Sequence, residues 1–303
     1  MPLAQKVSKN LGLKLSPLEI TVFADGEKRV RVVDNVVDIE TVVVQSTAAP
    51  ADANYMELFF IIDALKRSGA KSVTVVIPYL GYQRQDHVFR DGEAVSLGVV
   101  IKAIESLGAS KVITFDLHTV KIPELFRIPV SHLSALPLFA EKIKKMANGS
   151  PRVEAGQLSI VNCSLVSPDL GGVRRIKLIS EMLGNMPYAI IVKNRNLDSG
   201  EITAEKIEGK VFSKAVIVDD MISSGKTMVA AAELLKESGA QEIIAMATHA
   251  VLSSGSPEVL QNSIISKVFV TDTIAIPEQK KFPKLEVISV ADIIAKEIRK
   301  NNS

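Results

Sequence analysis

The chain has 303 residues, a formal net charge of +2 and 47% hydrophobic residues. This length fits two medium-sized domains, and the composition is that of a globular protein with a sizeable core. The nearly balanced charge excludes a broad basic field, so we expect no nucleic-acid partner. Apolar runs are too short to span a membrane and the N-terminus lacks a signal-peptide core, so we expect no membrane partner.

Cysteine usage points to a reducing compartment. Cys163 is the only cysteine, which excludes an internal disulfide framework. Its neighbours, Asn162 and Ser164, offer no partner that would mark it as a nucleophile or metal ligand. We therefore predict a structural cysteine and a cytoplasmic protein.

The first half of the chain alternates between short Val/Ile-rich runs and helical patterns. A short helix is predicted over 2–11, with Gly12 as its stop, and a strand over 19–23 is followed by a tight turn at 24–27. The chain is extended again over 29–33. Further strands are predicted at 42–45, 72–77 and 112–115, helices at 55–68 and 96–107, and a long polar loop after residue 77.

The second half repeats this plan. The predicted strands are 158–161, 188–192, 215–218, 242–247, 267–271 and 286–290. The predicted helices are 173–183, 228–238 and 291–300, and the polar loops are 166–172 and 193–201. Strands that alternate with helices indicate α/β architecture with parallel sheets, in which ligands bind at the carboxyl ends of strands.

A weak internal repeat supports two copies of one α/β unit. The pattern L-K-x-S-G-A followed by an apolar strand occurs at 65–70 and again at 235–240. Helix–Gly–strand junctions are common, so the repeat is modest support by itself. A turn-rich stretch at 148–151 places the domain boundary, giving domains 1–148 and 149–303.

The stretch A-V-I-V-D-D-M-I-S-S-G-K-T at 215–227 carries the strongest chemical signal. A predicted strand leads into Asp219 and Asp220, and a Ser/Gly/Thr loop then opens into a helix. The N-terminus of a helix offers unpaired N–H groups and a partial positive charge, which suit a phosphate. Two acids beside it suit sugar hydroxyls or a hydrated Mg²⁺. The arrangement suggests a sugar phosphate.

Two other interpretations of this stretch are weaker. G-K-T resembles the end of a Walker A loop, but the first glycine of that motif would fall at Asp220, whose charge opposes nucleotide phosphates. An ordinary capped strand–turn–helix connection is the other alternative. Two adjacent acids after a buried strand are unusual for a simple turn.

Other polar residues fall at predicted strand ends. Arg84 can bind phosphate through two N–H groups and Gln85 can bind an adenine edge, although a solvated loop explains both equally well. His118 follows another strand and can bind a metal or phosphate. Lys193 and Arg195 can neutralise charge on a transferred phosphoryl group, and their loop is polar enough to close as a lid.

Taken together, these pieces resemble the ribose-phosphate pyrophosphokinases, also called phosphoribosyl pyrophosphate synthetases. The resemblance spans about residues 23–290. The matching stretches, in order, are F-A-D-G-E at 23–27, Q-S-T-A-A-P at 45–50, P-Y-L-G-Y-Q-R-Q-D at 78–86, D-L-H at 116–118, V-S-P-D-L-G-G at 166–172, K-N-R at 193–195 and V-D-D-M-I-S-S-G-K-T at 218–227.

The resemblance implies two phosphoribosyltransferase-type (Rossmann-like) α/β domains with parallel sheets, related by a pseudo-twofold axis. It implies that MgATP and ribose 5-phosphate are converted to phosphoribosyl pyrophosphate and AMP, with Mg²⁺ as cofactor. It also implies a homo-oligomer, either a dimer or a hexamer built from dimers, because in this family the ATP site borrows a loop from a neighbouring subunit.

The same resemblance assigns roles to individual residues. Lys193 and Arg195 are the catalytic pair, and His118 and Asp169 are the Mg²⁺-linked positions. The ATP-binding residues are Phe23, Asp25, Gly26, Glu27, Arg84, Gln85 and Asp86. The ribose 5-phosphate residues are Arg195, Asp219, Asp220, Ser223, Ser224, Gly225, Lys226 and Thr227. Lys226 departs from the family loop, which commonly has a small residue there.

Two other functions compete with an active synthetase. One is a catalytically inactive associated protein that regulates a true synthetase, and retention of Lys193, Arg195 and Asp219 argues against it. The other is a phosphoribosyltransferase that acts on a nucleobase. Such an enzyme needs one domain of this type and no ATP loops, so Arg84 and Gln85 count against it.

Overall fold

The computed structural model describes residues 2–148, 162–195 and 202–301. Within these ranges the chain forms two compact units. Of the described residues, the N-terminal unit contains 2–134, 273–275 and 289–301, and the C-terminal unit contains 135–148, 162–195, 202–272 and 276–288. The boundary predicted between residues 148 and 149 adjoins the undescribed range 149–161 and stays a prediction, as does the pseudo-twofold relation.

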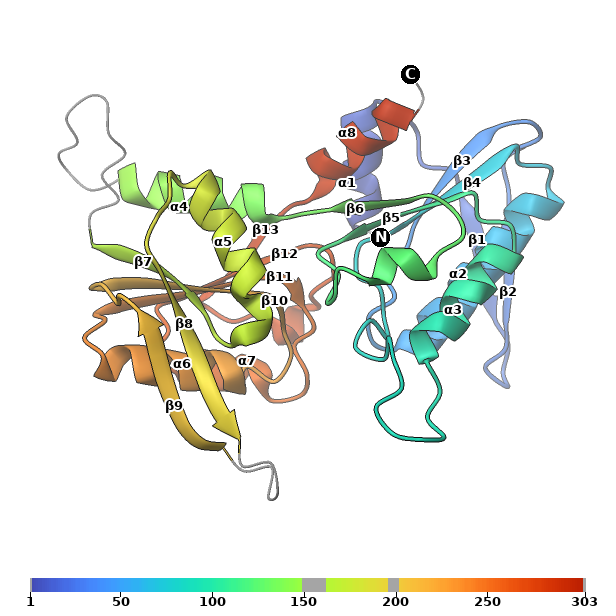
Figure 1. Cartoon of the computed structure of the whole chain (residues 1–303). Coiled ribbons are helices and arrows are strands. Elements are labelled where there is room, and N and C mark those ends of the chain that lie inside the picture. The colour runs from blue at the N-terminus through green and yellow to red at the C-terminus, as the bar shows by residue number, and fades with distance from the viewer. Residues whose placement is uncertain (1, 149–161, 196–201, 302–303) are drawn as a thin grey trace. The chain divides into compact units, whose positions relative to one another are not determined.

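The N-terminal unit is built on a parallel sheet of order β3-β4-β5-β6. Its elements are α1 (Pro2–Leu11), β1 (Leu18–Val22), β2 (Lys28–Val32), β3 (Glu40–Val44), α2 (Ala51–Arg67), β4 (Ser72–Ile77), α3 (Ser96–Ser106), β5 (Lys111–Phe115), η1 (Ile122–Leu125), β6 (Val130–Leu133) and α8 (Ala291–Asn301). Strands β1 and β2 form a separate antiparallel hairpin. Helices α2 and α3 lie on one face of the parallel sheet, and α1 and α8 lie side by side on the other (Figure 1).

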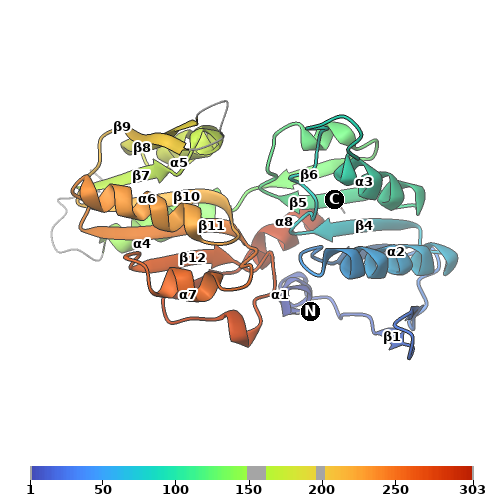
Figure 2. The ribbon, with the colours of Figure 1, turned by 90° about the horizontal axis from the view of Figure 1, so that it is seen from below.

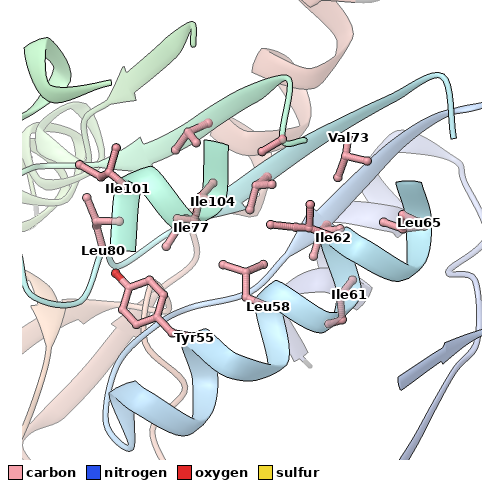
Figure 3. Packing of buried hydrophobic residues seen from close by; sticks show 14 of the residues in the cluster. Tyr55, Leu58, Ile61, Ile62, Leu65, Val73, Ile77, Leu80, Ile101 and Ile104 are labelled. Atoms are coloured by element: carbon pink, nitrogen blue, oxygen red, sulfur yellow. The ribbon is translucent and has the colours of Figure 1, made fainter. Parts of the chain in front are cut away.

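The core of this unit lies between its sheet and the helices α2 and α3. Val73, Val75 and Ile77 alternate along β4 toward this face, as the period of two in a strand requires, and all are fully buried. Leu58 and Ile62 meet them from one stripe of α2 (Figure 3).

The C-terminal unit contains a larger sheet of order β13-β12-β11-β10-β7-β8-β9 in the described residues, parallel except for β9. Its elements are α4 (Leu136–Asn148), β7 (Cys163–Ser167), η2 (Leu170–Gly172), α5 (Val173–Met182), β8 (Tyr188–Arg195), β9 (Ile202–Gly209), β10 (Lys214–Ile222), α6 (Lys226–Glu237), β11 (Glu242–Ala250), α7 (Ser256–Gln261), β12 (Lys267–Thr271), η3 (Glu278–Lys280) and β13 (Leu285–Ile288). Helices α6 and α7 cover one face, and α4 and α5 cover the other (Figures 1 and 2).

The predicted internal repeat is confirmed at the level of hydrogen bonds. After α2, Ala70 N–H donates to Leu65 and Gly69 N–H to Lys66. After α6, Ala240 N–H donates to Leu235 and Gly239 N–H to Lys236, which is the same Schellman motif. Both glycines have positive φ, +86° and +98°, which explains why glycine occupies this position in each copy.

Four predicted boundaries are wrong. Asp219 and Asp220 do not follow the end of their strand, because β10 continues to Ile222 alongside β11. Lys226 and Thr227 belong to α6 rather than to the loop. Val166 and Ser167 belong to β7 rather than to a loop. The segment 193–195 continues β8, because Lys193 and Asn194 pair with Glu205 and Ala204 of β9.

Two predicted segments lie wholly or partly outside the described residues. The strand predicted at 158–161 falls in the range 149–161, and the rest of the charged loop falls at 196–201. None of the described helices combines the length and apolarity that crossing a membrane would require.

Candidate active site

The predicted phosphate loop of the C-terminal unit forms the turn between β10 and α6. Gly225 caps the helix with φ of +78°, and a Cβ there would lie 3.0 Å from Leu260 Cγ. Both the backbone angle and this close approach require glycine. The loop is also tied to the next connection, since Ser253 N–H donates to the Ser223 carbonyl at 3.1 Å. Lys226 and Thr227 are exposed in the first turn of α6, where N–H groups can receive a phosphate.

The acid pair lies inside β10, immediately before this loop. Asp219 Oδ1 accepts a hydrogen bond from Asp220 N–H at 2.8 Å, and Asp220 Oδ1 accepts one from Met221 N–H at 3.0 Å. Arg175 of α5 donates to Asp219 Oδ1 at 2.8 Å, and its Nη2 lies 3.6 Å from Asp220 Oδ1. The two carboxylates are therefore held on one guanidinium.

Burial controls the ionisation of this pair. Burial raises the pKa of Asp219 to about 7, the negative charge of Asp220 adds to the rise, and Arg175 offsets part of it. The charge of the Asp219 carboxylate therefore changes with pH near neutrality.

Asp169 lies at the turn that follows β7, at the carboxyl end of that strand. Its Oδ1 accepts from Gly172 N–H at 3.2 Å, and its carbonyl accepts from Ser167 Oγ at 2.7 Å. The side chain caps the short helix η2 and remains exposed. Asp169 can therefore offer a carboxylate to a ligand from a fixed turn.

Lys193 and Arg195 lie near the end of the β8–β9 hairpin. Their backbones belong to β8, and their side chains lie outside the described residues. The predicted catalytic role of this pair therefore stays a prediction.

The predicted ATP residues of the N-terminal unit form two surface loops. Phe23, Asp25, Gly26 and Glu27 make the tight turn between β1 and β2, closed by a 2.8 Å hydrogen bond from Phe23 N–H to the Glu27 carbonyl. The Phe23 ring is 44% exposed and has the Arg29 guanidinium 5.8 Å from its centre. An exposed aromatic face beside two acidic side chains suits a nucleobase.

The second loop, residues 78–95, carries Arg84 and Gln85, both exposed. Asp86, the third predicted ATP residue of this loop, stabilises the loop. Its Oδ2 accepts from Thr119 Oγ1 at 2.8 Å and its Oδ1 lies 2.6 Å from His87 Nδ1. Burial pushes the pKa of Asp86 upward, but the hydrogen bonds from Thr119 and His87 outweigh it and leave that pKa below its ordinary value. Asp86 thus remains charged at neutral pH.

A buried clamp holds the start of this loop. Gly81 N–H donates to Thr47 Oγ1 at 2.8 Å, and Tyr55 Oη donates to the Gly81 carbonyl at 2.8 Å. Tyr55 reaches from α2 toward the segment around Leu80 (Figure 3). Thr47 and Tyr55 are at most 2% exposed, and burial raises the pKa of Tyr55 above its ordinary value. Sequence reasoning missed both residues, although Thr47 lies within the Q-S-T-A-A-P stretch.

His118 follows β5 and is exposed, and its predicted role as a metal-linked residue stays a prediction. Its backbone N–H donates at 3.0 Å to Oε1 of Gln83, a buried residue of the polar loop 78–95. The loop and the predicted metal position are therefore linked directly. His118 and Asp169 belong to different units, so each is described separately.

Comparison with known proteins places this fold and these loops in one class. Residues 1–108 match the model for the N-terminal domain of ribose phosphate pyrophosphokinase, and residues 199–303 match a phosphoribosyl synthetase-associated domain. Both descriptions name phosphoribosyl or ribose-phosphate synthesis proteins.

Full-length relatives agree. A ribose-phosphate pyrophosphokinase of Thermotoga maritima is 41% identical over 98% of this chain and 90% of its own length. One of Caldanaerobacter subterraneus is 41% identical with the same two coverages. The crystal structure of phosphoribosylpyrophosphate synthetase from Mycobacterium smegmatis matches with a TM-score of 0.89 and 34% identity, covering 100% of this chain and 96% of the other. The chain belongs to the ribose-phosphate pyrophosphokinase family.

Proposed function

We propose that this chain is an active ribose-phosphate pyrophosphokinase. It transfers the pyrophosphoryl group of MgATP to the anomeric hydroxyl of ribose 5-phosphate, giving phosphoribosyl pyrophosphate and AMP. The observation that carries this proposal is the sequence of chemical groups from β10 into α6. Acceptors for sugar hydroxyls are followed directly by a phosphate-binding helix N-terminus.

The sugar phosphate is the acceptor substrate at this loop. Ser223, Ser224, Gly225, Lys226 and Thr227 receive its 5-phosphate through N–H groups, hydroxyls and the Lys226 ammonium group. Asp219 and Asp220 accept hydrogen bonds from its ring hydroxyls. The 5-phosphate then anchors the sugar, so the anomeric hydroxyl is oriented by binding energy from a remote group.

ATP is the donor substrate at the N-terminal unit. Phe23 stacks on the base, and the acids of the same turn accept hydrogen bonds from its amino group. Arg84 binds the phosphates, Gln85 contacts the adenine or ribose, and Asp86 fixes the loop that carries them. The buried clamp formed by Thr47, Tyr55 and Gly81 holds the start of this loop.

The reaction requires little covalent chemistry from the protein. The anomeric oxygen attacks the β-phosphorus in line and its hydroxyl proton is released to solvent, while AMP leaves with the electrons of the broken P–O bond. Lys193 and Arg195 neutralise the charge that develops on the transferred group, and Arg195 also contacts ribose 5-phosphate. The hairpin that carries them excludes water when it closes.

The metal we propose is Mg²⁺, because it binds phosphate oxygens and keeps several waters rather than requiring a protein cage. When bound, it neutralises charge on the ATP phosphates. Asp169 is an exposed carboxylate on a fixed turn and fits such a hydrated ion. His118, a nitrogen donor, fits better through a metal-bound water or a phosphate oxygen.

The first test is a coupled assay for AMP formation from ATP with and without ribose 5-phosphate. AMP formation that requires the sugar phosphate supports the proposal. Folded protein without turnover would instead favour the inactive regulatory alternative. We place the enzyme in the cytoplasm as a homo-oligomer, and light scattering tests the assembly.

The second test is Lys193→Ala. Loss of a cation at the transferred group is expected to reduce kcat by orders of magnitude while KM changes little. The matched control is Lys206→Ala on the neighbouring strand β9, because that side chain is 73% exposed and pairs only weakly with Glu208 at 3.8 Å. Equal turnover in both variants would remove Lys193 from the mechanism.

A further inference from the structure

A single arginine links the acid pair of the proposed sugar-phosphate site to the turn that carries Asp169. Arg175 lies near the start of α5, and its side chain is 15% exposed. Its Nη1 donates to Asp219, and its Nη2 lies 3.6 Å from Asp220, so both ends of the planar guanidinium are directed at the acid pair. A planar fork of donors matches carboxylate geometry in a way that an ammonium group cannot.

The position of Arg175 follows from the shape of the sheet. Strands β7 and β10 pair only as far as Val166 and Ile217, and β10 continues beyond that point. The turn of η2 and the start of α5 fill the place beside β10 that β7 has left. Arg175 therefore meets the acid pair where the ladder on that side has ended.

The same guanidinium lies close to the turn that carries Asp169. A Cβ on Gly172 would lie 3.3 Å from Arg175 Nη1 and 2.4 Å from Ser167 Oγ. Gly172 N–H is also the group that Asp169 Oδ1 accepts from. The absence of a side chain at Gly172 thus allows the arginine to pack directly on the Asp169 turn.

We propose that Arg175 is a positioning residue for ribose 5-phosphate: it holds Asp219 and Asp220 in one fixed arrangement and couples that arrangement to the turn of Asp169. This inference rests on the proposed function of the acid pair. Arg175 touches no reacting atom. It acts through the carboxylates, whose geometry decides how well the sugar hydroxyls are bound.

A purely structural role for Arg175 predicts different results from a positioning role. A largely buried ion pair is weak support for stability, because desolvation cancels much of the attraction. Loss of a stabilising contact would lower the melting temperature and leave substrate affinities unchanged or weaken both. Loss of a positioning residue weakens one substrate selectively.

The experiment measures the Kd of ribose 5-phosphate by calorimetry and the two KM values by steady-state assay, for wild type, Arg175→Met and Arg175→Lys. Methionine keeps an unbranched apolar stem and carries no charge. We expect Arg175→Met to raise the Kd and KM of ribose 5-phosphate about 10- to 100-fold, the factor that corresponds to loss of one charge-assisted hydrogen bond between a displaced carboxylate and the sugar. The KM of ATP is expected to stay within about twofold.

Arg175→Lys restores the charge but not the fork, so we expect a smaller rise of about three- to tenfold. Arg174→Met is the matched control, because Arg174 is the preceding residue of α5 and is exposed. We expect it to resemble wild type in both affinities. If Arg175→Met does not fold, the same measurements on Arg175→Lys decide.

An unchanged ribose 5-phosphate affinity in the folded variant would overturn the inference, and so would equal losses for both substrates. Calorimetry separates this inference from the proposed function. Wild type that binds ribose 5-phosphate without turnover contradicts the enzyme activity and still permits the test of Arg175 through Kd. Wild type that does not bind the sugar phosphate overturns both.

Discussion

The polar loop after β4 and the phosphate loop after β10 both follow a buried parallel strand, and their supports differ in chemistry. In the N-terminal unit, Thr47 and Tyr55 hold Gly81 through neutral hydrogen bonds in a site with almost no exposure. In the C-terminal unit, Arg175 holds two carboxylates by charge. Neutral hydrogen bonds keep their geometry across the physiological pH range, whereas a charged pair near its pKa does not. We therefore expect pH to affect sugar-phosphate binding more than ATP binding.

The largest effect is expected from Gly81→Ala. A Cβ on Gly81 would lie 2.4 Å from the Thr47 carbonyl oxygen, which is backbone and cannot rotate away. Such overpacking should destabilise the N-terminal unit by about 3 kcal/mol. The counterpart is Gly172→Ala, where the 2.4 Å contact is with the Ser167 hydroxyl, the end of a short side chain that can rotate.

We therefore expect a smaller loss for Gly172→Ala, about 1 kcal/mol. Scanning calorimetry of the two variants beside wild type measures both losses. Equal losses would contradict the view that the clamp of the N-terminal unit is the more rigid of the two supports.

Tyr55→Phe removes one donor from the neutral clamp and leaves the buried Gly81 carbonyl without it. The expected cost is about 1–2 kcal/mol of stability. The KM of ATP should rise while the KM of ribose 5-phosphate stays constant, because only the loop of the N-terminal unit is loosened. Tyr82→Phe removes a surface hydrogen bond of the same loop, to Asp52, and shows how much of the change the loss of any loop hydrogen bond causes. A rise in both KM values after Tyr55→Phe would show that the clamp serves more than its own loop.

The charged support predicts a pH effect. Because the pKa of Asp219 is raised to about 7, its ionisation takes place between pH 6 and 8. In the proposed site the carboxylate is the form that accepts sugar hydroxyls, so the KM of ribose 5-phosphate should fall as pH rises, by about tenfold across this window. A rise in pH is expected to have the opposite effect on stability. The folded state binds this proton more tightly than the unfolded state, so the free energy of unfolding falls as pH rises toward 7.

The phosphate of the ligand titrates near pH 6, so Asp219→Asn is the necessary control. Only the part of the pH dependence that disappears in this variant belongs to the carboxylate. A pH profile unchanged by Asp219→Asn would exclude Asp219 as its source.

The smallest effects concern the repeated helix ends. Alanine at Gly239 or Gly69 should cost about 1 kcal/mol, because both residues have positive φ. Gly69→Ala should cost slightly more, since its Cβ would lie 3.3 Å from Val37 Cγ2 whereas the Cβ of Gly239 would meet nothing within 4 Å. Calorimetry again measures the difference. A larger loss at Gly239 would show that the two copies of the motif are not equivalent.

The sequence predicted most strands and helices because their apolar periods are strong and their ends carry glycine. It failed where tertiary pairing extends a strand through polar residues. Met221 and Ile222 continue β10 because His249 and Ala250 of β11 lie opposite them. Similarly, Lys193 stays in β8 because a strand of mixed polarity, β9, pairs with it.

Site residues divide in the same way. Asp219 and the following loop could be identified locally, since acids, glycine and a helix start are adjacent in the chain. Arg175 could not, because its partner is 44 positions away and only the fold brings them together. The role of Tyr55 could not be predicted for another reason. Within the apolar stripe of α2 an aromatic residue is typical of the core, and the structure is needed to show that its hydroxyl donates to the Gly81 carbonyl.

The return of the chain to its first unit has a consequence for biosynthesis. Helix α8 packs on α1, and its Glu297 accepts hydrogen bonds from Ser131 and Lys111. The residues of α1 and of the parallel sheet are therefore synthesised long before the helix that covers this face of the sheet. Most of the N-terminal unit leaves the ribosome before the C-terminal unit, but it is completed only once α8 follows, and truncation within α8 would leave its apolar face open to aggregation.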